Sequence, residues 1–433
     1  MRRCLHVQRA ALRCSARRRL SSVGSASPTT NYKFVSLTPE LFPQGYGGDL
    51  EEDKFQYVFE GGGGDVVMER RVTEELLKLM TQIEGEPAGT PLRLDDDDWT
   101  CDACGQLNSA SKSKRMFCAT CEACRRGLPR RAHYFLTGHR GTGKSVAMNY
   151  AVDAARKRGW LCLHVPKAYN MMNEGDYVVP SEHHEGLFEQ PSTSRDLIEA
   201  FSKAHAGQLS RVPLKDVRHR ERWGLAEKDS TLAGLIAAAL EPEQLDSSST
   251  ALADIRAELS LTVEYPVLIA IDEYTSMFSP MTNYWFAMKN LRPEQMVAIR
   301  ALRQLDPTTT TPLPLARGFE LFAESQAYKP KFKLKQDLRQ SFPHMPVELR
   351  CTPYTKSEFI ATCHRYLKVL TTSNFQGDRD MLSMYMATQG NPRELFRRML
   401  VLENVETVVS GLQKRQREPG PKIGVIRAAQ LLE

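Results

Sequence analysis

One eight-residue segment constrains the fold of this chain more than any other feature. It matches the pattern Gly-x-x-x-x-Gly-Lys-Ser/Thr in full, with the residues Gly138, His139, Arg140, Gly141, Thr142, Gly143, Lys144 and Ser145. An apolar run at 134–136 predicts a strand before it, and residues 144–157 predict a helix after it. Glycines let the backbone turn so that successive N–H groups point at phosphate oxygens, and the helix N-terminus adds positive charge. The segment therefore predicts a nucleotide site rather than a glycine-rich turn that binds nothing.

Within that site the chemistry of each side chain predicts its role. Lys144 is expected to contact the β- and γ-phosphates, and the Ser145 hydroxyl is expected to bind Mg²⁺. A second motif supplies the acids, because the apolar run 267–271 is followed by Asp272 and Glu273. We predict that Asp272 holds Mg²⁺ directly or through water, and that Glu273 is a candidate catalytic base. An acid after a buried strand also often caps the next element, so turnover stays open.

Two further segments are candidates for contact with a nucleotide. The sequence Gly390-Asn391-Pro392-Arg393-Glu394 resembles the second sensor of AAA+ and STAND nucleoside triphosphatases, in which an arginine of a helical lid touches the γ-phosphate. The same residues also suit a helix start, with Asn391 as the cap and Glu394 closing a capping box. Ser325, after the apolar stretch 319–323, is a weaker first-sensor candidate. A stretch at 355–358 reads better as a helix capping box than as a guanine-binding motif.

Ten cysteines are present, and five of them lie within 24 residues. Two pairs with Cys-x₂-Cys spacing give the four thiolates that a tetrahedral structural zinc requires, Cys101, Cys104, Cys118 and Cys121. Cys124 forms another such pair with Cys121, which leaves the fourth ligand open. Trp99 and Asn108 resemble those of Ran-binding-protein zinc ribbons, although the middle spacing is longer here. Seven Lys/Arg between Lys112 and Arg131 predict RNA contact beside this module.

The N-terminus has the composition of a mitochondrial transit peptide. Residues 1–20 contain seven arginines and no acid, and the first acid is Glu40. We predict cleavage near residues 20–22; a basic arm that touches RNA is the alternative. Removing seven charges from the net +6 leaves −1, so contact with nucleic acid depends on local patches. No apolar run approaches the length of a membrane-spanning helix.

Length and pattern together predict the organisation of the chain. With 433 residues, of which 41% are hydrophobic and 25% charged, two to three domains of a soluble globular kind are expected. Further strands near 160–165, 319–323 and 347–350 alternate with helices near 194–209, 230–241, 250–259, 293–304 and 355–370, which indicates a parallel sheet covered on both faces. The predicted parts are a transit peptide (1–20), an N-terminal extension with one helix (21–94), a zinc-ribbon insertion with a basic stretch (95–131), a P-loop nucleotide-binding domain (132–352) and a C-terminal helical domain (353–433).

Several segments carry a resemblance to a known family. The phosphate loop, the acid-ending strand, and the stretches 160–166, 188–191 and 293–303 resemble the death-associated protein three family of mitochondrial small-ribosomal-subunit proteins, over roughly residues 68–402 without the cysteine cluster. The resemblance implies a P-loop NTPase fold of the STAND/AAA-like kind, with a C-terminal helical lid, here carrying the zinc ribbon as an insertion. It also implies a place in the mitochondrial matrix, in the small ribosomal subunit, with rRNA and mitoribosomal proteins as partners.

The resemblance implies a ligand as well, GTP with Mg²⁺, although the residues alone leave ATP or GDP open. Two features depart from the family pattern, the cysteine insertion at 99–124 and the second acid Glu273. We therefore expect a structural ribosomal protein that holds a nucleotide, with slow GTPase or ATPase activity left open. The alternatives are a free mitochondrial STAND/AAA-type ATPase, which would use Glu273 and Arg393 for turnover, and a zinc-finger RNA-binding adaptor, whose RNA binding would survive Lys144→Ala.

Overall fold

The protein is described here by a computed structural model that covers residues 32–46, 66–87, 99–102, 104–108, 118, 120–121, 132–175, 177–305, 314–325, 346–369 and 377–399. The predicted transit peptide, Cys124 and the basic residues of 112–131 lie outside these described residues. The chain divides into a short N-terminal unit, Met1–Tyr32, and a large unit, Lys33–Glu433.

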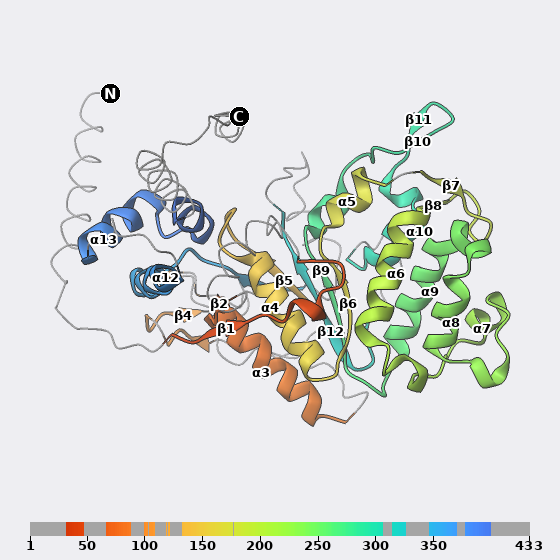
Figure 1. Ribbon diagram of the computed structural model, residues 1–433, viewed down its shortest axis with the longest axis horizontal. Helices are drawn as coiled ribbons and strands as arrows, with labels where there is room; N and C mark the ends of the chain where they lie inside the picture. Colours follow the sequence, from red (N-terminus) through yellow and green to blue (C-terminus); the bar gives the residue numbers. More distant parts are fainter. Residues whose placement is uncertain are drawn as a thin grey trace, which may run out of the picture. The chain divides into compact units, whose positions relative to one another are not determined.

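A five-stranded parallel sheet forms the centre of the large unit (Figure 1). Its strands lie in the order β13 (Val347–Arg350), β5 (His133–Thr137), β12 (Gly318–Ala323), β9 (Val267–Ile271) and β6 (Leu161–Val165), and every neighbouring pair is parallel. All residues of β5, β6, β9 and β12 are buried. This burial explains why these strands are mostly apolar rather than alternating between apolar and polar residues, and it confirms the predicted fold class.

Helices cover both faces of this sheet, and each face has its own hydrophobic core (Figure 1). On one face, α3 (Arg71–Gly85) and α4 (Lys144–Lys157) pack against Leu136 and Leu268. On the other face, Leu163 and Ile269 contact a layer of four helices, α6 (Pro191–His205), α8 (Leu232–Ala239), α9 (Ser248–Leu261) and α10 (Val297–Leu302). In β5, β6, β9 and β12, side chains alternate between the two cores, as the two-residue period of a strand requires.

The part of the chain that the structure describes also contains short strand pairs, helices and 3₁₀ turns outside the central sheet. Four two-stranded antiparallel pairs are formed by β1 (Phe34–Ser36) with β2 (Val66–Met68), β3 (Trp99–Thr100) with β4 (Leu107–Asn108), β7 (Val179–Pro180) with β8 (Phe188–Glu189), and β10 (Trp285–Phe286) with β11 (Lys289–Asn290). The described residues also contain the helices α5 (Ala168–Asn173), α7 (Val217–Arg222), α12 (Lys356–Val369), α13 (Gly377–Thr388) and one at 392–399. Short 3₁₀ turns lie at Pro39–Leu41, Leu209–Arg211, Glu227–Asp229, Pro242–Ser247, Tyr274–Phe278 and Pro293–Gln295.

The predicted helix at 293–304 is interrupted in the structure. A 3₁₀ turn at Pro293–Gln295 and α10 are separated by Met296, whose backbone is extended, with φ −97° and ψ 122°. Met296 instead forms a parallel β-bridge with Phe188, and its side chain is fully buried. The prediction of one continuous helix was wrong because a tertiary contact over more than 100 residues outweighs local helix propensity.

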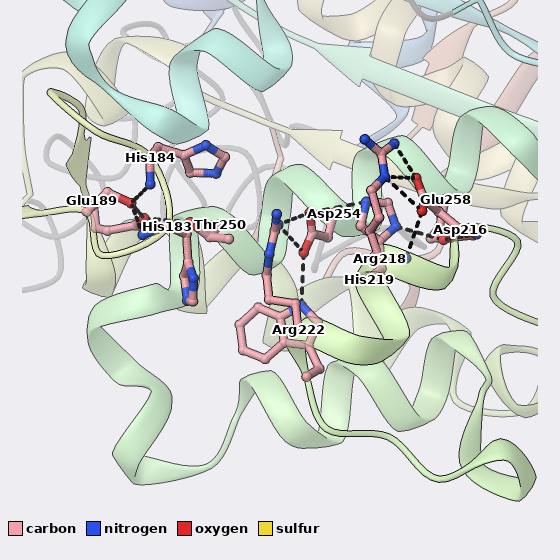
Figure 2. Close-up of polar contacts among 12 residues, drawn as sticks. His183, His184, Glu189, Asp216, Arg218, His219, Arg222, Thr250, Asp254 and Glu258 are labelled. Atoms are coloured by element: carbon pink, nitrogen blue, oxygen red, sulfur yellow. Dashed lines mark hydrogen bonds and ion pairs between the residues drawn. The ribbon is translucent and has the colours of Figure 1, made fainter.

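A polar cluster fixes α7 onto α9 in the outer helical layer, as Figure 2 shows. Nδ1 of His219 lies 2.7 Å from Oε1 of Glu258, and its Nε2 lies 3.3 Å from Oδ1 of Asp254. Asp254 also accepts hydrogen bonds from Arg222, at 2.7 and 2.8 Å, and from the indole N–H of Trp223, at 2.9 Å. Although burial opposes it, these carboxylates raise the pKa of His219 above its ordinary value. The charged residues of this cluster are therefore explained by their contacts between α7 and α9.

Candidate nucleotide and metal sites

The phosphate-loop residues connect β5 to α4 and adopt a conformation that needs glycine. Gly138, Gly141 and Gly143 have φ values of 139°, 82° and 95°, which lie in the region that side chains with a Cβ rarely adopt. Space is also limited, because a Cβ on Gly138 would lie 2.2 Å from the carbonyl oxygen of Cys351. Gly143 is the N-cap residue of α4, so the loop leads directly into a helix N-terminus. These backbone turns, together with the helix N-terminus, suit a bound phosphate chain.

Lys144 lies over this loop rather than away from it. Its ammonium group donates to the carbonyl oxygens of Gly138 and His139, at 2.9 and 3.1 Å. Burial lowers the pKa of Lys144, and the nearby acids Asp272 and Glu324 oppose that effect. The other motif side chains differ in exposure: Thr142 is buried and donates to the carbonyl oxygen of His139 at 2.8 Å, whereas His139 and Arg140 are exposed and Ser145 is half-buried.

The predicted acids stand at the same edge of the sheet as the loop. Asp272 follows β9 and is 2% exposed, and its Oδ1 accepts the backbone N–H of Glu273 at 2.8 Å. Glu273 is half-buried and has a φ of 55°, which turns the chain sharply after the strand. Because β5 and β9 are both paired with β12 in parallel, their carboxyl ends meet at this edge. The structure therefore brings Lys144 and Asp272 into one site.

Residues that follow β12, the strand between β5 and β9, also lie at this edge of the sheet. Ser325 lies two residues after β12, and its backbone N–H donates to the hydroxyl of Thr275 at 3.0 Å. The first-sensor candidate is thus at the expected edge of the sheet. Glu324, which the sequence analysis did not single out, immediately follows β12 and acts electrostatically on Lys144. The first polar residue after the apolar run of β12 was the signal that could have identified it.

The lid docks directly on the phosphate loop. Oδ1 of Asn391 accepts the backbone N–H groups of Arg393 and Glu394, at 3.0 and 3.3 Å, which confirms the predicted helix cap. The amide Nδ2 of Asn391 donates to the carbonyl oxygen of Arg140 at 2.8 Å, and the N–H of Arg393 also lies 3.2 Å from the carbonyl oxygen of Gly141. The backbone of Arg393 therefore lies at the loop.

One detail of this cap differs from the prediction. A capping box would require the Glu394 side chain to accept the N–H of Asn391, but that N–H donates to the carbonyl oxygen of Thr388 at 3.0 Å. The preceding residue, Gly390, has a φ of 71° and turns the Asn391 backbone toward the end of α13. The capping box at 355–358 is confirmed: the N–H of Thr355 donates to Glu358 at 2.7 Å, and the N–H of Glu358 donates to the Thr355 hydroxyl at 3.3 Å.

A residue that sequence reasoning missed ties these parts together. Arg70, just before α3, donates to the backbone carbonyl oxygens of Thr142 in the loop, at 3.3 Å, and of Thr352, at 2.9 Å. It also pairs with Glu358 on α12 at 3.3 Å, and its guanidinium lies 5.0 Å from the ring centre of Tyr354. No local pattern identifies such an arginine, because its partners lie up to 288 residues away.

The four predicted zinc ligands are brought together in the second site. The Sγ atoms of Cys101, Cys104, Cys118 and Cys121 all lie within 4.8 Å of one another. Cys101 and Cys121, and likewise Cys104 and Cys118, are 3.5 Å apart at sulfur. Tetrahedral zinc with bonds of about 2.3 Å places its sulfurs about 3.8 Å apart, so the donor set fits this metal. Trp99 and Asn108 are cross-strand partners in the β3–β4 pair beside it.

The electrostatics of the cysteine site favour a thiolate at Cys118 and oppose one at Cys104, whose pKa is raised. Burial raises the pKa of Cys118, but hydrogen bonds from the backbone of Cys121 and Thr120 outweigh it and lower the pKa to about 6. The turn is tight, since the N–H of Gly105 donates to the carbonyl oxygen of Cys101 at 2.7 Å. Thiolates are the form in which cysteine binds metal.

Fold and site together define a P-loop domain of the nucleoside triphosphatase kind. Residues 129–376 match the family model described as mitochondrial ribosomal death-associated protein 3. This match spans more than half of the chain, so the chain belongs to that family, as the resemblance predicted. As a member of it, the chain is a mitochondrial protein, which confirms the predicted location.

Two curated relatives carry the name small ribosomal subunit protein mS29. The protein from Mus musculus is 23% identical over 242 residues, which cover 54% of this chain and 61% of the relative. The protein from Bos taurus is 24% identical over 242 residues, which cover 54% and 60%. The chain thus matches about three fifths of the length of these relatives.

Solved structures with a similar arrangement are more distant. The Walker-type ATPase PABY2304 of Pyrococcus abyssi has a TM-score of 0.32 and 13% identity, covering 66% of this chain and 70% of that one. The ORC2 protein of Aeropyrum pernix in its ADP form has a TM-score of 0.34 and 11% identity, covering 66% and 59%. Within the described part of the chain, no helix combines the length and apolar character needed to cross a bilayer.

Proposed function

We propose that this chain is a structural component of the small subunit of the mitochondrial ribosome, with small-subunit rRNA and neighbouring mitoribosomal proteins as its partners. The family match over residues 129–376 is the observation that carries the proposal. The names of the two mS29 relatives, each a small ribosomal subunit protein, support it further.

Sedimentation tests this role most directly. Mitochondrial lysate is separated on a density gradient in the presence of Mg²⁺, and the fractions are probed for this chain and for a small-subunit rRNA. We expect the chain to sediment with the small subunit, and to move to the top of the gradient when EDTA and RNase dismantle the particle. A chain that stays at the top in intact lysate would contradict the ribosomal proposal.

In this role we propose that the P-loop holds a purine nucleoside triphosphate, GTP, together with Mg²⁺. The backbone N–H groups of residues 138–145 and the ammonium of Lys144 would bind the phosphates, Ser145 and Asp272 would hold the metal, and Arg393 would reach the nucleotide from the lid. The left-handed glycines and the lid contacts at Gly141 support this assignment. A ligand held only by the folded chain stabilises it by mass action, so GTP, ATP and GDP can be ranked by the melting temperature at equal concentration.

Slow hydrolysis is the second candidate activity. Glu273 follows Asp272 in a half-buried turn, where it could polarise an attacking water, but turnover also needs a charge-stabilising arginine at the γ-phosphate. Arg393 already has a structural place at the start of a helix. We therefore propose slow or absent turnover. Phosphate release by the purified chain tests this: robust multiple turnover that falls steeply in Glu273→Gln would favour a free ATPase instead.

We further propose that the four cysteines bind one structural Zn²⁺, and that the basic stretch at 112–131 contacts rRNA beside it. The spacing of the sulfurs supports the zinc assignment, and the seven cations of that stretch support the RNA contact. Contacts to phosphate weaken as salt rises. Replacing these cations in pairs with glutamine should flatten the salt dependence of RNA binding, and an unchanged dependence would remove the stretch from the RNA interface.

A further inference from the structure

Two consecutive arginines connect the cysteine site with the phosphate loop. Arg70 is the last residue before α3, and Arg71 is the first residue of that helix. Arg70 contacts the loop and the lid, whereas the Nη2 atom of Arg71 lies 2.5 Å from Oδ1 of Asp102. Asp102 stands between the zinc ligands Cys101 and Cys104. One peptide bond therefore separates a residue on the metal site from a residue on the nucleotide site.

On the nucleotide side, Arg70 is half-buried and contacts several segments of the chain. Its side chain is 18% exposed. It donates a hydrogen bond to the carbonyl oxygen of Thr142, a fully buried residue of the loop. Nearby Glu358 raises the pKa of Arg70, although burial opposes it. Because the same guanidinium reaches Thr352, Pro353 and Glu358, its position affects the loop and the start of α12 together.

On the metal side, the position of Asp102 depends on the turn that the cysteines form. The N–H of Cys101 donates to the carbonyl oxygen of Gln106 at 2.8 Å, and this turn carries Asp102 toward α3. Small ribbons of this kind lack a core and fold only when metal holds their thiolates. Metal therefore decides whether Asp102 is fixed beside Arg71.

We propose that metal at the cysteine site raises the affinity of the P-loop for nucleotide. The inference rests on the nucleotide and zinc sites proposed above. With metal in place, Asp102 holds Arg71, the first turn of α3 is fixed, and Arg70 stays on Thr142 and Glu358. Without metal, Arg71 loses its contact with Asp102, so the start of α3 and Arg70 are less fixed. The loop and the lid must then be ordered when nucleotide binds, and the lost conformational entropy reduces the free energy of nucleotide binding. Coupling between two binding sites is reciprocal, so nucleotide raises zinc affinity by the same factor.

Titration of the full chain with a fluorescent GTP analogue tests the coupling. Protein with its metal content measured is compared with protein stripped by a chelator under reducing conditions. We expect the stripped chain to bind about fivefold more weakly, at the lower end of usual coupling, because Arg71 and Asp102 are partly exposed, at 25% and 41%. Arg71→Ala should show the same weakening while it still holds zinc, and chelation should then change little.

A matched control breaks a different ion pair on the same helix. Lys78 pairs with Glu75 at 2.8 Å on α3, and its side chain is 60% exposed. Lys78→Ala leaves Arg70 and Arg71 in place, so it should keep the full response to chelation. Equal affinities of loaded and stripped wild type would overturn the coupling and leave both binding sites standing. A chain that holds no zinc, or that binds no nucleotide, would instead overturn the corresponding site and the coupling with it. Arg71→Ala keeps all four cysteines, so it tests the link even if the stripped chain is unstable.

Discussion

The side-chain amide of Asn391 donates a hydrogen bond of 2.8 Å to the backbone carbonyl of Arg140, across 251 residues of sequence. The same side chain caps the helix at 392–399 through its oxygen. One asparagine thus uses its acceptor to start the lid helix and its donor to hold the lid on the phosphate loop. The two functions can be separated by mutation.

Asn391→Asp keeps the capping oxygen but removes the donor, while Asn391→Ala removes both. We expect Asn391→Ala to lower the free energy of unfolding by about 1 kcal/mol through loss of the cap, and Asn391→Asp to lower it less. Both variants should weaken nucleotide binding because the lid loses its bond to the loop. Denaturant unfolding and nucleotide titration check this, and normal affinity in Asn391→Asp would show that the Arg140 contact does not matter for binding.

Gly141→Ala and Gly143→Ala should differ although both residues have positive φ. A Cβ on Gly141 would lie 2.5 Å from Oδ1 of Asn391 and 2.8 Å from Cβ of Arg393, whereas a Cβ on Gly143 meets nothing within 4 Å. Gly143→Ala should therefore cost only backbone strain, about 1 kcal/mol. Gly141→Ala should in addition displace the lid, which faster proteolysis of residues 377–399 would report. Equal proteolysis of the two variants would contradict the lid contact.

Lys144→Ala should abolish most stabilisation by nucleotide and leave the fold intact. The ammonium donates to two loop carbonyls, and burial opposes its charge, so its removal should cost the apo fold little. The measurement is the melting temperature with and without GTP and Mg²⁺. A variant that retains the full nucleotide-dependent rise would remove Lys144 from the phosphate site.

About one zinc per chain is expected, held by the four cysteines named above. Cys121→Ser should lose the metal, and Cys124→Ser is the matched control, because Cys124 has the same spacing on the other side of Cys121. Metal analysis of freshly reduced protein measures both. If Cys124→Ser loses zinc and Cys121→Ser keeps it, the ligand set must be revised, and protein without zinc would refute the site.

His219 should make the stability of the outer helical layer depend on pH. The raised pKa in the folded state means that its contribution is complete below the unfolded value of about 6.5 and is lost as the pH rises through the folded value. His219→Gln should therefore cost about 1 kcal/mol at pH 5.5 and less at pH 8.5. Urea unfolding at both pH values measures this. Exposed His183 gives the control variant His183→Gln, and an equal cost of His219→Gln at both pH values would contradict the assigned pKa direction.

The parallel sheet was predictable because its buried strands are short apolar segments that alternate with helices along the sequence. The convergence of Lys144 with Asp272 was predictable because each residue belongs to a short motif at the carboxyl end of such a strand. The proximity of the four cysteines was predictable for the same reason, since two Cys-x₂-Cys pairs are the spacing that a structural zinc site uses. Arg70 was not predictable, because an arginine before a helix looks the same whether it faces solvent or Glu358. The break at Met296 was hidden too, since its cause is the distant bridge to Phe188.

The packing of α3 determines where the chain can be cut for expression. Leu76, Leu79, Met80 and Ile83 of α3 are buried in the same core as Leu136 of β5 and Met148 of α4. A recombinant fragment that begins at residue 129, where the family match begins, would expose this face of the sheet to water. Such a fragment should aggregate during purification, whereas one that begins before Arg70 retains the helix that covers this core.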